Sequence, residues 1–255
     1  MFLTTATGSP RPTELQRLYE SVATLRRQID GPYYLSDVDG NGNWPTRGIY
    51  IFFDPQTDFD SPTSQWSISR VGTVGDCKPS SSTLWERLRA HRGTKRGTYK
   101  SGGNHRGSVF RRHVGEAIIR QDGLRDEYPH WGVPHRSLPD DVETQTLREN
   151  EHPLEQRVSE YIRSLPFLWI GVPGEPGPDC ERAMLEKNLI GLIAHSRKTV
   201  PGLIRNDWLG RKAAKPRITR TGLWNLDHTG GLFDQNVTAD FEEYVQETQP
   251  LNSDC

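Results

Sequence analysis

The chain has 255 residues, of which 33% are hydrophobic and 25% are charged, and its formal net charge is −1. This length allows one large domain with insertions or two small ones, and the low hydrophobic fraction predicts long polar loops around a buried core. No apolar run approaches the roughly 20 residues of a membrane-spanning helix, and the N-terminus lacks the basic start and apolar core of a secretory signal.

The first predicted element is a helix over 12–29, because apolar residues recur there at helical spacing and Thr13 can cap its start. A loop rich in Gly, Asn and Asp follows over 31–43. Two strands are predicted over 47–54 and 65–73, and the polar connection between them reads as a long hairpin loop. The N-terminal part therefore predicts a helix followed by the first two strands of a sheet.

The middle of the chain is predicted to be mostly helical. Thr83 and Glu86 have the capping-box arrangement, a hydroxyl at the N-cap and a carboxylate three residues later, which predicts a helix over 84–91. Further helices are predicted over 106–121 and 152–164.

The last third begins with a continuously apolar segment over 166–172, which predicts a buried third strand. Asp179 can then cap a helix that runs to about His195. The segment 199–235 has weak periodicity and predicts loops and short elements. The final twenty residues are acidic, and we expect them to be partly disordered.

This order of elements predicts an α/β protein with a small, mainly antiparallel sheet flanked by helices. We expect an N-terminal helix and loop over 1–45 and a core over 46–198. The core is expected to contain a large, mostly helical insertion at about 93–164, and a C-terminal extension with an acidic tail occupies 199–255.

Charge is strongly segregated along the chain although the net charge is close to zero. The stretch from Arg87 to Arg112 holds nine Lys or Arg residues and no acid, and the stretch from Pro201 to Gly222 holds six against the single Asp207. Such blocks can form a surface that attracts a polyanion, here predicted to be DNA. The basic residues expected to contact it are Arg89, Arg92, Lys95, Arg96, Lys100, Arg106, Arg211 and Lys212. The alternative is a solvated face over which neighbouring acids fold.

The cysteines predict a reducing compartment. Cys77, Cys180 and Cys255 are odd in number, far apart and without CxxC spacing. This pattern argues for reduced thiols in a cytoplasmic protein and against a zinc site.

Three side chains on predicted neighbouring elements suggest phosphodiester chemistry. Tyr50 projects from the first strand, and Arg87 and His91 stand at i and i+4 on one face of the helix that follows the second strand. A guanidinium suits a phosphate, and an imidazole can move a proton near neutral pH. The basic region around them fits a nucleic-acid substrate.

Glu186 falls at the centre of an apolar arc of its predicted helix. A carboxylate on a core-facing surface is costly unless it is paired or ligates a cation. Two interpretations stay open at this point. One is an ion pair, for example with Arg182 one turn earlier, and the other is a ligand for Mg²⁺, which needs only one or two protein carboxylates.

Taken in order, these pieces resemble the GIY-YIG nuclease superfamily. The resemblance rests on Gly48-Ile49-Tyr50 in the first strand, Val71-Gly72 in the second, Arg87 and His91 in the next helix, and Glu186 in the helix after the third strand. The Arg-x-x-x-His spacing most resembles the restriction-type and repair-type members.

The resemblance implies a metal-dependent DNA endonuclease that leaves 5′-phosphate and 3′-hydroxyl ends. In the family pattern Tyr50 would act as general base or orient the attacking water, and Arg87 would bind the scissile phosphate. His91 would orient Tyr50 or transfer a proton. Glu186 would hold one divalent ion, Mg²⁺ or Mn²⁺, on the leaving-group side.

The second motif departs from the family pattern, which carries a tyrosine before its Val-Gly pair. This chain has Arg70 at that position, and an arginine cannot transfer a proton there, although it could contact the phosphate. A catalytically weakened nucleic-acid-binding module on the same scaffold therefore stays open. A second alternative is an interaction protein whose basic spans meet an acidic partner.

Two further points are left open by the sequence. Asn206 and Asn225 are both candidates for the active-site asparagine that some family members place after the glutamate, and spacing does not choose between them. The oligomeric state is also open, although a restriction-type enzyme that cuts a palindromic site would need a homodimer.

Overall fold

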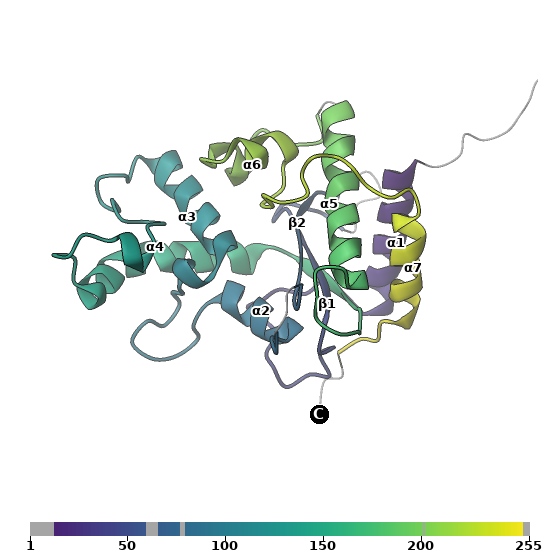
Figure 1. Cartoon of the computed structure of the whole chain (residues 1–255), viewed down its shortest axis with the longest axis horizontal. Coiled ribbons are helices and arrows are strands. Elements are labelled where there is room, and N and C mark those ends of the chain that lie inside the picture. The colour runs from purple at the N-terminus through teal and green to yellow at the C-terminus, as the bar shows by residue number, and fades with distance from the viewer. Residues whose placement is uncertain (1–12, 60–65, 77–79, 201, 252–255) are drawn as a thin grey trace, which may run out of the picture.

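The computed structural model describes residues 13–59, 66–76, 80–200 and 202–251 (Figure 1). Within these ranges the strands are β1 (Gly48–Phe53), β2 (Ile68–Thr73) and β3 (Phe167–Gly171). The helices are α1 (Glu14–Gln28), α2 (Leu84–Arg92), α3 (Val109–Asp122), α4 (Thr144–Ser164), α5 (Glu181–Thr199), α6 (Pro216–Thr221) and α7 (Val237–Glu247). Short 3₁₀ helices occupy His105–Gly107, His135–Ser137 and Leu209–Lys212. The predicted α/β fold with a small antiparallel sheet is confirmed.

The three strands form one antiparallel sheet in the order β2-β1-β3. Every residue of β1 is buried, because this strand is central and both of its faces are covered. Tyr50 pairs with Gly72 on β2 and with Trp169 on β3, and Phe52 pairs with Arg70 on β2. Cross-strand partners point to the same face of a sheet. Tyr50, Gly72 and Arg70 therefore share one face.

Helices cover both sides of the sheet (Figure 1). On one side α5 packs against β1 and β2, while α1 and α7 lie side by side and contact β3. On the other side, His91 of α2 and Phe110 of α3 pack against Tyr50 and Phe52. One continuous core joins these layers, and the predicted division of the chain at residues 45 and 198 stays a prediction.

The cap predicted at Thr13 and the capping box predicted at Thr83 are both present, and the cap at Thr13 is also a capping box. Thr13 and Thr83 each accept a hydrogen bond from the backbone N–H three residues later, and the side chain at that position bonds back to the cap. The prediction that Asp179 caps α5 is wrong, because the helix begins later and Cys180 occupies the N-cap without a side-chain bond. Helix α4 also begins earlier than predicted, since Glu143 caps it at Thr144 and the helix continues through a proline.

The acidic tail was expected to be partly disordered, and within its described part this expectation is wrong. Residues Val237, Phe241 and Val245 recur every four positions and form the buried side of α7. This side packs against α1, so the tail is held by apolar contacts despite its acidic composition. Residues 252–255 lie outside the described part.

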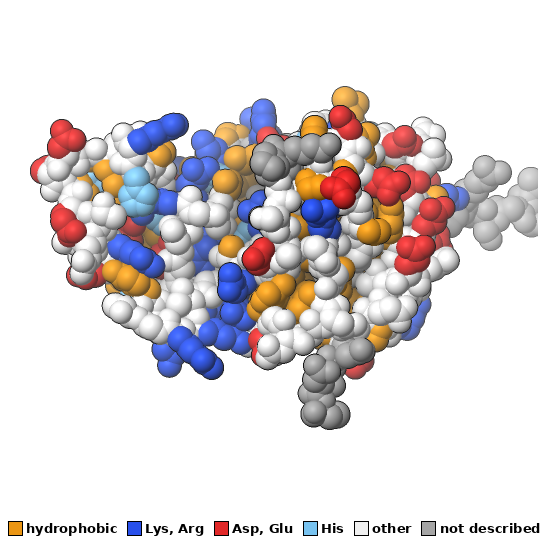
Figure 2. All heavy atoms as spheres, turned by 60° about the horizontal axis from the view of Figure 1, so that its bottom comes forward, with side chains coloured by type: hydrophobic (Ala, Val, Ile, Leu, Met, Phe, Trp, Pro, Cys, Tyr) orange, Lys and Arg blue, Asp and Glu red, His pale blue; other side chains and the backbone are white. Residues whose placement is uncertain are grey.

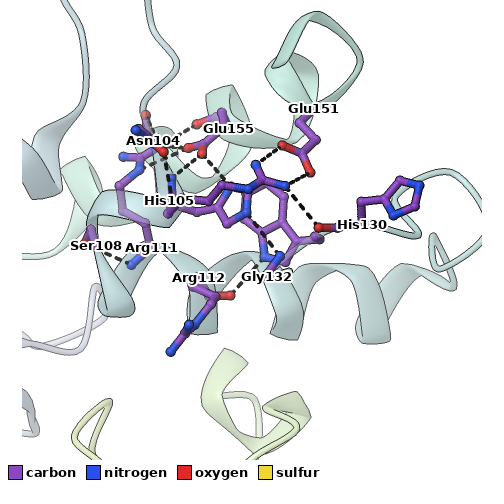
Figure 3. A network of polar contacts seen from close by, with 12 residues as sticks. Asn104, His105, Ser108, Arg111, Arg112, His130, Gly132, Glu151 and Glu155 are labelled. Atoms are coloured by element: carbon purple, nitrogen blue, oxygen red, sulfur yellow. Dashed lines mark hydrogen bonds and ion pairs between the residues drawn. The ribbon is translucent and has the colours of Figure 1, made fainter. Parts of the chain in front are cut away.

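Buried ion pairs join α3 and α4 within the mostly helical segment between α2 and β3 (Figure 3). Glu155 Oε1 lies 2.9 Å from His105 Nδ1, and Glu155 Oε2 lies 3.0 Å from Arg111 Nε. Burial alone would raise the pKa of Glu155, but the hydrogen bond from His105 and the charge of Arg111 lower it. Glu151 pairs with Arg106 in the same network, with Nη2 and Oε1 2.9 Å apart.

Some predictions fall on residues that are not described. Cys77 and Cys255 lie outside the described ranges, whereas Cys180 carries a free thiol. The hairpin connection between β1 and β2 is described only as far as residue 59. No helix in the described ranges is long and apolar enough to cross a membrane.

Candidate active site

Tyr50 and His91 form a buried hydrogen bond at the centre of the candidate site. Tyr50 Oη lies 2.8 Å from His91 Nε2, and the other ring nitrogen, His91 Nδ1, lies 3.0 Å from Ser108 Oγ. The tyrosine comes from the middle of β1 and the histidine from the last turn of α2, and both are at least 98% buried. The structure thus brings the two residues of the first and third sequence landmarks into direct contact.

Gly72 makes room for the Tyr50 ring. A Cβ atom placed on Gly72 would lie 2.2 Å from Tyr50 Oη and 2.3 Å from Cζ, which is far inside van der Waals contact. Because Gly72 is the β2 partner of Tyr50, any side chain there would push the phenol out of its position. The second motif therefore needs a glycine, because the Tyr50 ring of the first motif occupies the space that a side chain at position 72 would take.

His91 is held in its neutral form. Burial lowers the pKa of His91 well below its usual range, and the positive charges of Arg70, Arg87 and Arg111 lower it further. These charges come from β2, α2 and α3, so they surround the ring from three elements. A neutral imidazole has one N–H donor and one acceptor nitrogen.

Glu186 is a half-buried carboxylate on α5 with a raised pKa of about 7. The main cause is burial, which disfavours the charged form; Arg70 and Arg87 oppose the shift, and Asp76 and Asp227 add to it. Glu186 makes no hydrogen bond or ion pair with any residue of the described ranges. It is a carboxylate that its protein neighbours leave unpaired.

The ion pair between Glu186 and Arg182 that the sequence left open does not form. Arg182 is fully buried, and its guanidinium donates to backbone carbonyls that follow β2 and β3, among them Val74 O at 2.7 Å and Gly174 O at 3.0 Å. Its charge is therefore used to hold two loops together. The interpretation of Glu186 as a cation ligand remains.

Arg70 and Arg87 act electrostatically on both His91 and Glu186. The two arginines therefore lie near both groups, and Tyr50 of β1 contacts His91 directly. Arg87 is exposed, and its guanidinium has no hydrogen bond or ion pair with the described residues. It is therefore free to bind an anion.

Arg70, the residue in place of the second tyrosine, is held more firmly. Its Nη1 donates to Trp224 O at 3.1 Å, and its guanidinium lies 4.8 Å from the centre of the Phe110 ring. Its Nε is buried and has no hydrogen-bond partner among the described residues. Arg70 is a fixed positive charge whose buried Nε–H is unpaired within the described ranges.

Asn225 lies beside the site and Asn206 does not. The Asn225 side chain bonds both backbone groups of Val71, with Nδ2 2.8 Å from Val71 O and Oδ1 3.2 Å from Val71 N. Asn206 is exposed in the loop after α5. Sequence spacing could not choose between them, because the contact depends on how the segment after α6 folds back onto β2.

The donor set around Glu186 suits a cation that keeps most of its own water. No group of three or more His, Cys, Asp or Glu in the described ranges could hold a metal ion. One unpaired carboxylate is present, and Asp76 and Asp227 add negative charge around it. Sequence analysis missed these two aspartates, which follow β2 and the Asn225 turn. Mg²⁺ commonly binds through one or two carboxylates and completes its shell with water and substrate phosphate.

The residues predicted to contact DNA fall into two groups. Arg106 and Arg92 are used internally: Arg106 pairs with Glu151, while Arg92 is buried, donates to Val38 O at 3.1 Å and stacks over Trp85. The exposed ones are Arg89, Lys95, Arg96, Lys100, Arg211 and Lys212. Sequence reasoning could not separate the groups, because the internal partners come from other parts of the chain.

Acidic side chains do not cover this basic region on the face shown in Figure 2. Lys and Arg side chains are concentrated in its left and central parts, whereas Asp and Glu crowd together most at the right end, where α1 and α7 lie. Helix α7, in the described part of the acidic tail, packs against α1, α5 and β3. Glu151 and Glu155 of α4 nevertheless pair with Arg106 and Arg111, so the alternative in which neighbouring acids fold over the basic stretch is borne out at these two residues.

Comparison with known proteins gives one finding. A family model described as the GIY-YIG domain matches residues 9–251, a range that contains every helix and strand named above. Neither the curated proteins nor the solved structures contain a match to this chain.

Proposed function

This chain belongs to the GIY-YIG domain family, and from that premise we propose that it is a metal-dependent DNA endonuclease that leaves 5′-phosphate and 3′-hydroxyl ends. Members of the family are usually endonucleases, so a nuclease domain with a nucleic-acid substrate is the general expectation. One observation carries the specific proposal. Arg70 and Arg87 act on both His91 and Glu186, which supports a site that combines a phosphate-binding group, a proton-handling pair and a carboxylate unpaired within the described ranges.

The proposed reaction is hydrolysis of one P–O bond. The oxygen of a water attacks phosphorus, the bond from phosphorus to O3′ breaks, and O3′ leaves with a proton from solvent. Negative charge on the phosphate oxygens increases in the transition state, so fixed positive groups accelerate the reaction. Arg87 has a free guanidinium whose planar donors match two phosphate oxygens, and Arg70 adds a charge that cannot move away.

Tyr50 is assigned the proton from the attacking water. It accepts this proton as a phenolate and returns it to solvent after the reaction. His91 is not the final acceptor, because burial and three arginines hold its pKa well below the usual range. His91 instead keeps Tyr50 in place through the 2.8 Å hydrogen bond. The proton-handling pair therefore consists of one reacting group and one orienting group.

Glu186 is the residue proposed to hold Mg²⁺ or Mn²⁺. Its side chain fits a cation, because it is half-buried, unpaired within the described ranges and raised in pKa to about 7. A bound divalent ion would supply charge neutralisation at the phosphate and the leaving oxygen. Glu186 binds a cation only when ionised, so protons and metal compete for this side chain.

A plasmid-nicking assay with Mg²⁺ tests the proposal. The intact protein should nick, and Tyr50→Phe and Glu186→Gln should each lower the rate by roughly 10²- to 10⁴-fold while DNA binding is retained. Glu181→Gln is a matched control, because Glu181 is on the same helix but is exposed and bonds Tyr244 of α7. Equal nicking by the parent and both site variants would refute the assignment.

A second candidate, a weakened module that binds nucleic acid without cutting it, is favoured by Arg70 in place of the family tyrosine. Such a module would bind DNA with a steep salt dependence and would not nick with Mg²⁺ or Mn²⁺. Arg70→Tyr separates the two candidates. The variant gains activity if the missing phenol limits cutting, and it loses activity if the fixed charge of Arg70 serves the reaction.

A further inference from the structure

We propose that Ser108 is a positioning residue of this site: its hydroxyl donates to His91 Nδ1 and so fixes the ring in the form whose Nε2–H donates to Tyr50. The catalytic consequence rests on the proposed endonuclease function. The hydrogen-bond arrangement itself belongs to the protein alone and can be measured without DNA.

Ser108 lies outside the sequence landmarks and reaches the site from the segment between α2 and β3. It is the N-cap of α3, and its Oγ accepts a hydrogen bond from Arg111 N at 3.3 Å. The same Oγ lies 3.0 Å from His91 Nδ1. Ser108 is only 2% exposed, and these are its Oγ partners among the described residues.

Counting hydrogens leaves two arrangements, and each leaves one buried hydroxyl hydrogen without a partner in the described ranges. A hydroxyl has one hydrogen to donate and two lone pairs that accept. If His91 Nδ1 carried the ring hydrogen, Ser108 Oγ would accept from both His91 and Arg111, and its own hydrogen would be buried without an acceptor in the described ranges. Leaving a buried donor unsatisfied is unfavourable. When Ser108 donates to Nδ1 instead, Ser108 and the His91 ring are satisfied, and the hydrogen without a partner is that of Tyr50. We choose this second arrangement because Tyr50 is the group that exchanges a proton in the proposed reaction.

This arrangement has a consequence for Tyr50. With Nδ1 occupied as an acceptor, the single hydrogen of the neutral ring lies on Nε2 and points at Tyr50 Oη. Tyr50 then accepts from His91, and its own O–H points away from the ring. The hydroxyl hydrogen left without a partner in the described ranges belongs to Tyr50, the group that must exchange a proton in the proposed reaction.

The neutral state of the ring makes the choice of nitrogen decisive. Charged groups face His91 from three elements, namely Arg70 on β2, Arg87 on α2 and Arg111 on α3, and all of them are positive. The aromatic rings of Tyr50, Phe52 and Phe110 also pack against the His91 ring.

Arg111 forms hydrogen bonds with both Ser108 and His91 and so fixes their relative position. Its Nη1 donates to His91 O at 2.8 Å, and its backbone N–H is the one that Ser108 caps. The Arg111 side chain is fully buried and is itself bonded to Glu155 and Ser159 of α4 (Figure 3). The helical segment between α2 and β3 therefore contributes to the active site by fixing the orientation of His91.

The test is ¹⁵N NMR of histidine-labelled protein without DNA or metal, with His91→Gln used to assign the signals. We expect His91 Nε2 to carry the hydrogen and Nδ1 to lack one. Three variants then separate the hydroxyl from the helix cap. Ser108→Thr keeps both, Ser108→Ala loses both, and Ser108→Asp keeps the cap but can only accept a hydrogen bond.

Ser108→Asp is the decisive variant, because it should move the ring hydrogen to Nδ1 and turn Nε2 into an acceptor. If the proposal holds, Ser108→Asp and Ser108→Ala nick DNA roughly 10- to 100-fold more slowly than the parent, and Ser108→Thr remains close to it. If Ser108 serves only as a helix cap, Ser108→Asp and Ser108→Thr behave alike in both NMR and nicking.

Two results would overturn the proposal: a parent protein whose hydrogen lies on Nδ1, or a Ser108→Asp variant with an unchanged ring and an unchanged rate. Failure of the endonuclease function looks different. In that case no protein nicks DNA, while the NMR signals of the parent and of Ser108→Asp still differ as expected.

Discussion

Replacing Glu186 with glutamine should change how the stability of the protein depends on pH. Burial raises the pKa of Glu186 from 4.5 to about 7. The folded state therefore holds this proton more tightly than the unfolded state does, and the stability contributed by the protonated form is lost as the pH rises from about 4.5 to about 7. Glutamine has no such proton to lose.

The size of the effect follows from the two pKa values. Between pH 5 and pH 8 the parent should lose on the order of 2 kcal/mol relative to Glu186→Gln, since each pKa unit corresponds to about 1.4 kcal/mol and the half-buried side chain keeps some contact with solvent. At pH 8 the variant should thus be more stable than the parent. At pH 5, where the carboxyl is mostly protonated in the folded protein, the two should be similar.

Urea unfolding of both proteins at pH 5 and pH 8 measures this difference, because urea leaves the ionic strength unchanged. Glu181→Gln, on the same helix but exposed, is the control and should show no comparable difference. Mg²⁺ added at pH 8 should stabilise the parent and not Glu186→Gln, since a ligand that binds the folded state shifts the unfolding equilibrium. A parent and a Glu186→Gln variant that differ by the same amount at both pH values would show that Glu186 is not a destabilised carboxylate.

Three further predictions test other parts of the structure. Gly72→Ala should displace the Tyr50 ring, abolish nicking and lower the free energy of unfolding by about 1–3 kcal/mol. Normal nicking activity of this variant would show that β2 does not confine the ring. Arg106→Ala should destabilise the protein by about 3–5 kcal/mol, because it leaves Glu151 buried and unpaired. Arg96 is exposed, so Arg96→Ala should leave stability unchanged and reduce the salt slope of DNA binding by about one. The opposite pattern would reverse the assignment of the two arginines. Phe241→Ala should cost about 3–5 kcal/mol in thermal or urea unfolding, because α7 is held by its apolar side, and a negligible loss would support a disordered tail.

The elements that carry the site could be predicted from local sequence. The capping box at Thr83 fixes the start of α2, and with it the helical phase that puts Arg87 and His91 on one face. The apolar pattern around Tyr50 predicts a strand, and the glycine-containing second motif predicts its partner. These signals lie within a few residues of the groups that they position, so they can be recognised from the sequence alone.

The contacts that complete the site depend on long-range packing and could not be predicted. Ser108 meets His91 only because α3 folds back over the end of α2, and Asn225 meets β2 only because the chain returns after α6. The basic composition of the stretch likewise did not show that Arg106 forms an ion pair with Glu151. In each case the partner lies in a different part of the chain, where spacing gives no information.

The way Asn225 binds β2 has a consequence for the sheet as a whole. In the order β2-β1-β3, β2 has one side without a strand neighbour, and such an edge can pair with another chain. Asn225 offers Val71 an acceptor and a donor as a neighbouring strand would, and the backbone N–H of Trp224 bonds Ser69 O at 2.8 Å. The same turn that borders the active site thus blocks edge-to-edge association, so loss of the C-terminal segment would expose a template for aggregation.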